Sequence, residues 1–408
     1  MTVIECFERD PIDNIATCLS LRPDTLVLIG EEDELDENVK RYEHFIGRRR
    51  LPITVEPHSV NLDNVTEVID LLSTIVQTGD DCVIDLAGGD GNALAAAGVV
   101  YERYKDRYPV SLQRTNAMTG EAEDCDGDGE VEHLSNPKVT VKELIELYGG
   151  SIKHPLPPSE GLEDINPIWD ASIRNAGQWN RRVTALLEFE KYAEETASPL
   201  QVDINFGVVR NNVANYLDKR QLFDDLLRDL EACDVISVAS RAEGSFRYRY
   251  KSSFARRCLR KQGNVLEYKT LLEARGLREN GRTVFSDCRM SVSIDWDGII
   301  HEQVHGGVKD TRNEIDVLLM HGLTPVFISC KNGTVEEEEL YKLNTVADRF
   351  GGERARKVLI ATNCFPDDLD ARMSLEQRAR DMGICFEADA ANLTDAGWQA
   401  LLLDALDK

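Results

Sequence analysis

Short apolar runs alternate with amphipathic stretches along about the first 110 residues of the chain. The apolar runs lie at 25–30, 52–57 and 82–89, and the amphipathic stretches that follow them lie at 36–49, 64–77 and 92–104. This alternation predicts βαβ units and an open, mostly parallel sheet. In such a sheet the ligand binds where strands end and loops enter helices. We therefore expect a Rossmann-like α/β domain over residues 1–152.

The pattern changes at the proline-containing segment 153–167, because prolines prevent regular structure there. We expect a mostly helical connector over residues 153–262. A second α/β unit is predicted over 263–408, with a helix at 264–276, strands at 283–287, 290–297, 314–320 and 325–330, a helix at 335–350 and a strand at 357–362. This order resembles that of the restriction-endonuclease-like core.

Composition narrows the class of protein. The 408 residues include 47 basic and 73 acidic side chains, a net charge of −26, which argues against a non-specific nucleic-acid coat protein. A nuclease remains compatible, since it needs only a locally positive groove. Ten cysteines are scattered singly, and the sequence shows neither a signal-peptide pattern nor a long apolar run. We expect free thiols, no membrane association and a cytoplasmic location.

One basic run stands out in this acidic chain. Between 247 and 261 aromatic residues, Tyr248, Tyr250 and Phe254, are interleaved with basic ones. Such a run is either a solvated basic helix face or a groove wall that contacts phosphates and stacks bases. The residues predicted to line a nucleic-acid groove are Arg247, Arg249, Arg256, Arg257, Arg260 and Lys261.

An aspartate-rich segment imitates part of a calcium loop through Asp124, Asp126, Asp128 and Gly129. The twelfth position is Ser135 rather than a bidentate glutamate. A solvated β-turn is the better interpretation.

Charged residues gather on two neighbouring predicted strands. Residues two apart share a strand face, so Glu314 and Asp316 point the same way, as do Ser329 and Lys331 on the next strand. Two carboxylates can bind a hard divalent cation, while an ammonium positions water and offsets charge on a phosphate. Asp316, followed twelve residues later by "ISCK", resembles the PD-(D/E)xK nuclease motif, with Ser329 in the position of the second acid.

Other groups must then replace the missing acid. Glu314 shares the strand face of Asp316; Glu339 lies within the apolar stripe of the helix at 335–350, although the glutamates there also fit a solvated helix start. The nuclease resemblance adds Glu267 on the preceding helix. It implies Mn²⁺ or Mg²⁺, catalytic roles for Lys331, Asp316, Glu314, Glu339 and Glu267, and a metal site built from Asp316, Glu314, Glu339 and the Cys330 carbonyl.

A second candidate site lies near the N-terminus. In "DLAGGDGNALAAAG" (85–98) glycines let backbone N–H groups approach an anion at a helix N-terminus. Together with the loop in 8–30, this segment resembles the CARF domain, and nearly the whole chain resembles CRISPR-associated CARF nucleases. The resemblance implies a homodimer that binds cyclic tetra-adenylate through Arg9, Pro11, Asn14, Ala87, Gly88, Gly89, Gly91 and Asn92.

The leading hypothesis is a cyclic-oligoadenylate-activated metal endonuclease of type III CRISPR antiviral defence that hydrolyses DNA, RNA or both. The alternative is a ligand-gated nucleic-acid-binding regulator whose nuclease fold lost its chemistry at Ser329. A dehydrogenase-type enzyme is disfavoured because no GxGxxG follows the first strand.

Overall fold

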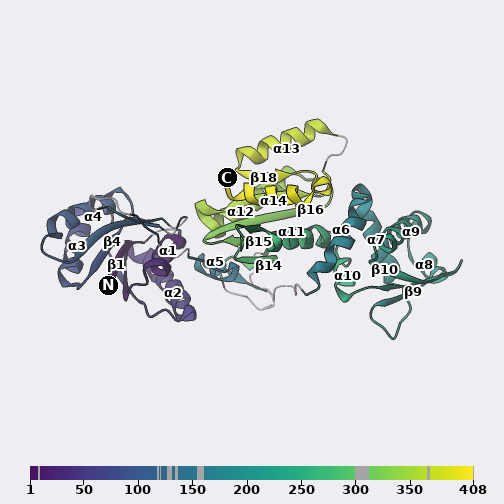
Figure 1. The fold of residues 1–408 in the computed structure, drawn as a ribbon, viewed down its shortest axis with the longest axis horizontal. Coiled ribbons are helices and arrows are strands. Elements are labelled where there is room, and N and C mark those ends of the chain that lie inside the picture. The colour runs from purple at the N-terminus through teal and green to yellow at the C-terminus, as the bar shows by residue number, and fades with distance from the viewer. Residues whose placement is uncertain are drawn as a thin grey trace, which may run out of the picture.

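The computed structural model describes residues 1–7, 10–116, 119, 121–125, 131–133, 137–153, 160–298, 312–364 and 368–407. Three units lie in a row along its long axis: an N-terminal sheet with its helices, a central C-terminal sheet, and a smaller unit of residues 160–262 (Figure 1). None of the helices in these ranges is long and apolar enough to cross a membrane.

The N-terminal sheet has seven strands in the order β3-β2-β1-β4-β5-β6-β7. Its strands are β1(Thr2–Cys6), β2(Thr25–Gly30), β3(Thr54–Ser59), β4(Cys82–Asp85), β5(Val110–Asn116), β6(Glu121–Asp124) and β7(Val131–His133). The first five are parallel, which confirms the predicted α/β class. The chain runs outward from β1 on one side and from β4 on the other, so a ligand crevice is expected between these two strands.

Helices cover both faces of this sheet: α1(Pro11–Leu21) and α2(Glu32–Arg49) one face, α3(Val65–Thr78) and α4(Gly91–Tyr104) the other. Strand β2 is therefore continuously apolar. Leu26 and Leu28 pack in the core beside α1 and α2, while Val27 and Ile29 pack beside α3 and α4.

The C-terminal sheet has the strand order β18-β17-β16-β15-β14-β8. Its strands are β8(Ser151–Ile152), β14(Asp287–Asp295), β15(Arg312–His321), β16(Thr324–Lys331), β17(Arg356–Ala361) and β18(Ile384–Glu387). Strands β14, β15 and β16 are antiparallel, and β16, β17 and β18 are parallel. The predicted boundary between residues 152 and 153 falls directly after β8, which pairs with β14 of this sheet.

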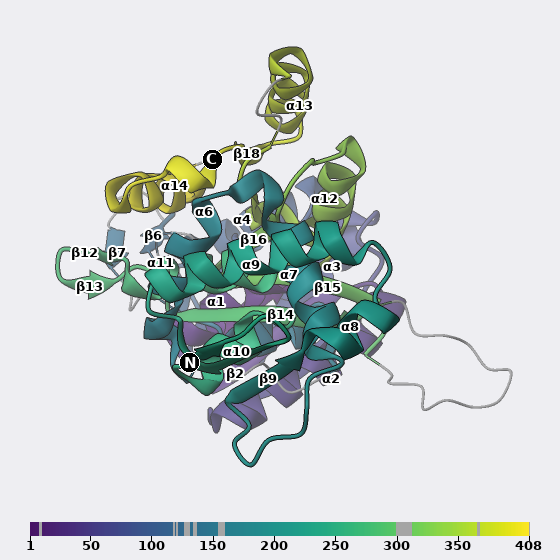
Figure 2. The ribbon, with the colours of Figure 1, turned by 90° about the vertical axis from the view of Figure 1, so that its right-hand side faces the viewer.

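Two separate cores hold the three units together. On one face of the C-terminal sheet, α11(Asn264–Gly276) and α14(Asp395–Asp407) share a core with the 160–262 unit. On the other face, α12(Glu337–Gly351) and α5(Val141–Leu147) share a core with α1 and α2 of the N-terminal unit. Figure 2 shows α11 crossing in front of β14 and β15, and α13(Leu369–Asp381) standing apart at the outer edge. Each face of the central sheet is thus joined to a different neighbour.

Helices make up the larger part of the 160–262 unit, but its sheet was not predicted from the sequence. Besides the helices it contains an antiparallel sheet in the order β10-β11-β9. Its elements are α6(Ile165–Ile173), α7(Trp179–Glu190), β9(Gln201–Asn205), α8(Phe206–Asn212), α9(Tyr216–Ala232), β10(Ile236–Arg241), β11(Ser245–Tyr250) and α10(Ser253–Cys258). A short turn joins α8 to α9, and the β10–β11 hairpin follows, so the order of elements resembles that of a winged helix-turn-helix.

Candidate functional site

The first candidate site lies on the β15–β16 hairpin. The structure confirms the predicted turn that brings these two strands together. Its register pairs Val317 with Ile328, which sets Asp316 opposite Ser329. The backbone N–H of Cys330 donates to Asp316 Oδ2 at 2.7 Å, and the Ser329 hydroxyl donates to the same oxygen at 3.3 Å. Ser329, which stands where the PD-(D/E)xK motif has its second acid, therefore helps to orient the Asp316 carboxylate.

Glu267 in the first turn of α11 joins this site. It is 2% exposed, and its oxygens accept from Lys261 Nζ at 3.3 Å and from the Ser291 hydroxyl at 3.2 Å. Burial and the charge of Asp316 raise the pKa of Glu267 to about 7, against the opposing effect of Lys261. Burial also raises the pKa of Asp316, although the Cys330 N–H and Lys331 favour its charged form. The carboxyl groups of Glu267 and Asp316 thus lie near each other in a place that water reaches poorly.

Ser291 is a site residue that the sequence analysis missed. It lies within β14 but has φ of 49°, in the left-handed region, at a point where the ladder with β15 skips a pair. Such strain in a non-glycine residue is typical of positions that the surrounding structure constrains. No sequence signal marks it, because serine carries no preference for this conformation.

The remaining predicted acids have other partners. Glu339 Oε2 lies 2.6 Å from Lys331 Nζ, and Glu339 Oε1 accepts from Lys342 at 3.1 Å. Partial burial opposes ionisation of Glu339, but the two lysines outweigh it and lower its pKa. Glu314 is half exposed and lies 3.7 Å from Lys261. Glu339 therefore neutralises the lysine instead of joining Asp316.

A cavity of about 370 Å³ opens between this hairpin and α12. Its lining includes Glu314, Asp316, Ser329, Lys331 and Glu339. Among the described residues, no three His, Cys, Asp or Glu side chains are grouped as a metal site. The carboxylates of Asp316 and Glu267 nevertheless fit a hard divalent cation, because Mg²⁺ is commonly held by one or two carboxylates together with water and phosphate.

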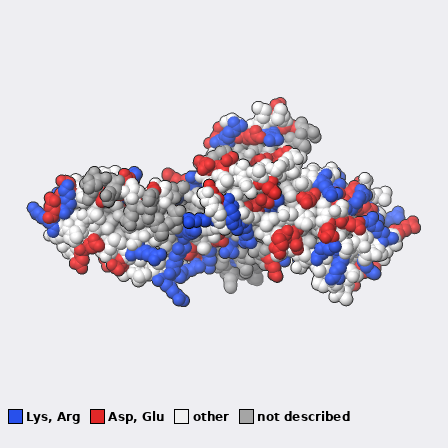
Figure 3. Space-filling model, in the orientation of Figure 1, with Lys and Arg blue, Asp and Glu red and all other residues white. Residues whose placement is uncertain are grey.

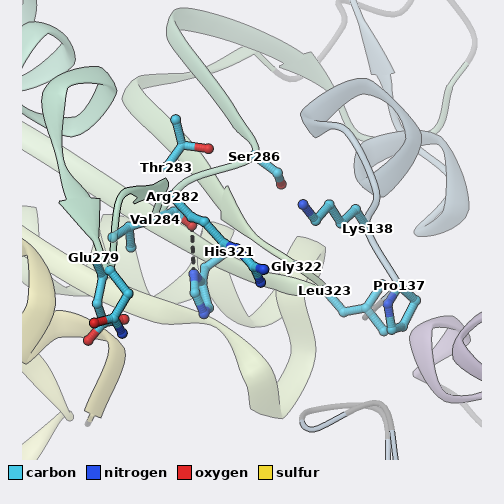
Figure 4. A pocket seen from close by; sticks show the side chains of 11 residues that line it. Pro137, Lys138, Glu279, Arg282, Thr283, Val284, Ser286, His321, Gly322 and Leu323 are labelled. Carbon is cyan, nitrogen blue, oxygen red and sulfur yellow. Dashed lines mark hydrogen bonds between the residues drawn. The ribbon is translucent and has the colours of Figure 1, made fainter. Parts of the chain in front are cut away.

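A larger cavity, about 790 Å³, lies at the other end of β15 (Figure 4). It is bordered by β12(Arg278–Glu279), β13(Arg282–Thr283) and the β15–β16 turn, and His321 Nδ1 lies 2.8 Å from the Val284 carbonyl oxygen. The predicted catalytic residues do not line it. We therefore place the candidate chemistry in the smaller cavity.

The aromatic residues of the basic run are core residues, so the prediction that they stack bases is wrong. Alternate residues of β11 are buried, and Tyr248 and Tyr250 both donate to Glu190 Oε1 at 2.5 Å. Phe254 is 2% exposed and packs edge-on against Tyr268. These rings are unavailable to a nucleic acid.

The basic side chains of the run lie at or near the surface. Arg247 and Arg249 occupy the exposed positions of β11, and Arg247 pairs with Asp203 at 2.8 Å. Arg257 donates to the Glu160 carbonyl at 3.0 Å, and Lys261 reaches Glu267 and Glu314. The run therefore leads from the β10–β11 hairpin to the candidate site.

Residues 160–262 contain sixteen basic and sixteen acidic side chains, whereas the whole chain has a net charge of −26. Figure 3 shows both signs interspersed over this unit. It repels a polyanion far less than the remainder of the chain does.

The second candidate site lies between the loops that follow β1 and β4. Gly89 has φ of 110°, and a Cβ there would lie 3.1 Å from the Cys6 Cβ, so the turn after β4 lies against the end of β1. Asp90 caps α4 by accepting from the Ala93 N–H at 2.8 Å. Ala87, Gly88, Gly89, Gly91 and Asn92 all lie in this turn or the first turn of α4, and none is fully buried.

Two other residues predicted to bind the ligand, Pro11 and Asn14, are buried, unlike those of the glycine turn. Asn14 is 1% exposed, and its amide donates to Glu5 Oε2 at 2.9 Å and to the Cys6 carbonyl at 3.0 Å. Pro11 is buried at the start of α1. Both side chains are buried in α1, whereas Arg9 lies outside the described residues. Asp126, Asp128 and Gly129 of the calcium-like segment are outside them too.

Glu5 on β1 gives a pH-dependent prediction. Complete burial, and secondly the charge of Asp85, raise the pKa of Glu5 well above its ordinary value. The folded chain then holds a proton that the unfolded chain releases, so the free energy of unfolding should fall as pH rises between the two pKa values, by at most about 1.4 kcal/mol per pH unit. Denaturant titrations of Glu5→Gln should show a smaller decline.

The exposed Glu56 on β3 supplies the control. Glu56→Gln should leave the wild-type pH profile unchanged. If Glu5→Gln follows the wild-type profile as well, the buried-acid assignment is wrong.

The fold and the two sites define an α/β protein. One of its sheets has a crevice between β1 and β4, where the strand order reverses, and the other borders a cavity lined by Asp316 and Lys331. No family model and no curated protein matches the sequence. Among solved structures, protein VC1899 from Vibrio cholerae matches with a TM-score of 0.71 and 17% identity, over 100% of this chain and 97% of that chain. Can2 from Sulfobacillus thermosulfidooxidans, solved with cyclic tetra-adenylate, matches with a TM-score of 0.66 and 14% identity, over 100% and 99%. These likenesses show the fold over the whole chain.

Proposed function

We propose that this chain is a cyclic-oligoadenylate-regulated, divalent-metal-dependent endonuclease of CRISPR defence. The observation that carries the proposal is the meeting of Asp316 and Lys331 in one cavity, with Glu267 buried beside Asp316. Buried acids with perturbed pKa values beside a lysine are typical of catalytic sites.

The residues have distinct proposed roles. Asp316 and Glu267 would hold Mn²⁺ or Mg²⁺, with the Cys330 carbonyl, Glu314 and water as further oxygen donors. When bound, the ion lowers the pKa of water and offsets charge on the phosphate. Lys331, once released from Glu339, would orient the attacking water and stabilise the charge that develops on phosphate oxygens. The exposed side chains of Arg247, Arg249 and Arg260 would guide a DNA or RNA strand toward Lys261.

The crevice between β1 and β4 is the proposed regulatory site. The glycine turn and the N-terminus of α4, a helix of 14 residues, offer backbone N–H groups to a phosphate. Can2, which shares this fold, was solved with cyclic tetra-adenylate. A symmetric ring ligand fits a symmetric homodimer, and Leu94 and Val99 expose apolar surface on α4 for a second copy.

One assay tests the proposal. The protein is incubated with plasmid DNA, single-stranded DNA and RNA, with and without cyclic tetra-adenylate and Mn²⁺. We expect cleavage that requires both additions and that chelation of the metal abolishes. A cleavage rate that is the same with and without cyclic tetra-adenylate would contradict the regulatory part of the proposal.

The second candidate is a nucleic-acid-binding regulator without chemistry. Two observations favour it: Ser329 stands where the PD-(D/E)xK motif has its second acid, and Lys331 is paired with Glu339. A shift in electrophoretic mobility of the nucleic acid, with no cleavage under any condition, would select this candidate.

A further inference from the structure

Arg354 joins two segments that are 344 residues apart in the sequence. It lies in the short turn directly after α12. Its Nη1 donates to Asp10 Oδ2 at 2.7 Å, and its other terminal nitrogen contacts Asp13. The side chains of all three are less than one fifth exposed. This ion pair therefore connects the loop bordering the nucleotide crevice to the C-terminal end of α12.

Two further residues fix the geometry. The Tyr148 hydroxyl, from the end of α5, donates to Asp10 Oδ1 at 2.6 Å. Gly352 has φ of 54°, and a Cβ there would lie 2.9 Å from Asp10 Oδ2 and 3.1 Å from the Tyr148 hydroxyl. Only glycine permits this close approach, so three segments meet at one carboxylate.

The opposite end of α12 carries Glu339, which holds Lys331 at 2.6 Å. Glu339 and Gly351 are separated by about 18 Å along the helix axis at 1.5 Å per residue. Because Val346 and Phe350 are buried between them, a shift at one end of the helix moves the other end with it.

We propose that Arg354 is a positioning residue that couples the N-terminal crevice to Lys331 through α12. A phosphate entering beside Asp10 repels the two aspartates and attracts the guanidinium. The ligand therefore favours the arrangement in which the Asp10–Arg354 pair is broken, and α12 is released. Glu339 then withdraws from Lys331. The inference rests on the proposed function and specifies its regulation.

The test compares Arg354→Gln, Arg354→Lys and a control, Arg372→Gln, which removes an ion pair with Glu376 on α13. Cleavage is measured without and with saturating cyclic tetra-adenylate. Arg354→Gln should raise the rate without nucleotide at least tenfold, so that the activation ratio falls toward one. Arg354→Lys should keep most of the ratio, and Arg372→Gln should keep all of it. An unchanged ratio in folded Arg354→Gln overturns the proposal.

A second readout does not need cleavage. Hydrogen exchange of residues 337–351 should increase on nucleotide binding in the wild type and should be high already in Arg354→Gln. If nothing is cleaved but this exchange pattern holds, the endonuclease proposal fails and the coupling stands. If nucleotide binds the wild type and exchange of α12 does not change, the coupling fails. Should Arg354→Gln not fold, Tyr148→Phe, which removes one hydrogen bond, should lower the activation ratio severalfold, and no change would overturn the coupling.

Discussion

Asp316→Asn should reduce cleavage by roughly 10²–10³-fold or more, the range found when one charge-stabilising group is removed from an active site. An asparagine oxygen can still accept from the Cys330 N–H, so the hairpin keeps its geometry. What is lost is the negative charge that would hold a divalent cation. Lys331→Ala should produce a loss of similar size, because the charge on the phosphate is then unbalanced. Rates are measured at saturating nucleotide and Mn²⁺.

The matched control is Asp348→Asn on α12, an exposed aspartate outside the cavity. It should cleave like the wild type. Both Asp316→Asn and Lys331→Ala should still bind the nucleotide when followed by calorimetry, since the crevice lies in a different sheet. Wild-type cleavage by either variant would remove this site assignment.

Much of the fold could be predicted because its signals are local. The alternation of apolar runs and amphipathic stretches gave the parallel sheet, and the turn at Gly322 together with the spacing of Asp316 and Lys331 gave the hairpin. A strand that is buried on both faces, such as β2, is recognisable from its continuous apolar sequence.

The predictions were wrong or incomplete where tertiary contacts determine the surroundings of a side chain. Residues 245–250 alternate in burial with period two, but the predicted role of Tyr248 rests on composition. Its burial is set by packing in a core shared by several elements, and its hydroxyl donates to Glu190 at the end of α7. Likewise, nothing local identifies Glu339 as the partner of Lys331 or Arg354 as the partner of Asp10. Such pairs are set by how whole elements pack together.

The role of Tyr248 yields the largest expected effect on stability. Tyr248 is fully buried beside Phe246 and Tyr250, so Tyr248→Ala should lower the free energy of unfolding of the 160–262 unit by about 3–5 kcal/mol. The loss includes the ring contacts and leaves a cavity that the surrounding helices cannot fill. Hydrogen exchange of β9, β10 and β11, measured with denaturant unfolding, reports the change.

Arg249→Ala, one residue along the same strand, is the control. Its side chain is exposed, so its effect on stability should stay within about 0.5 kcal/mol. In the proposed function it should weaken nucleic-acid binding and make that binding less sensitive to salt, because one phosphate contact is removed. A Tyr248→Ala protein as stable as the wild type would contradict the expected packing role of Tyr248. Alternate residues of β11 face the core and the solvent. Comparing Tyr248→Ala with Arg249→Ala therefore distinguishes an effect on core packing from an effect on nucleic-acid binding.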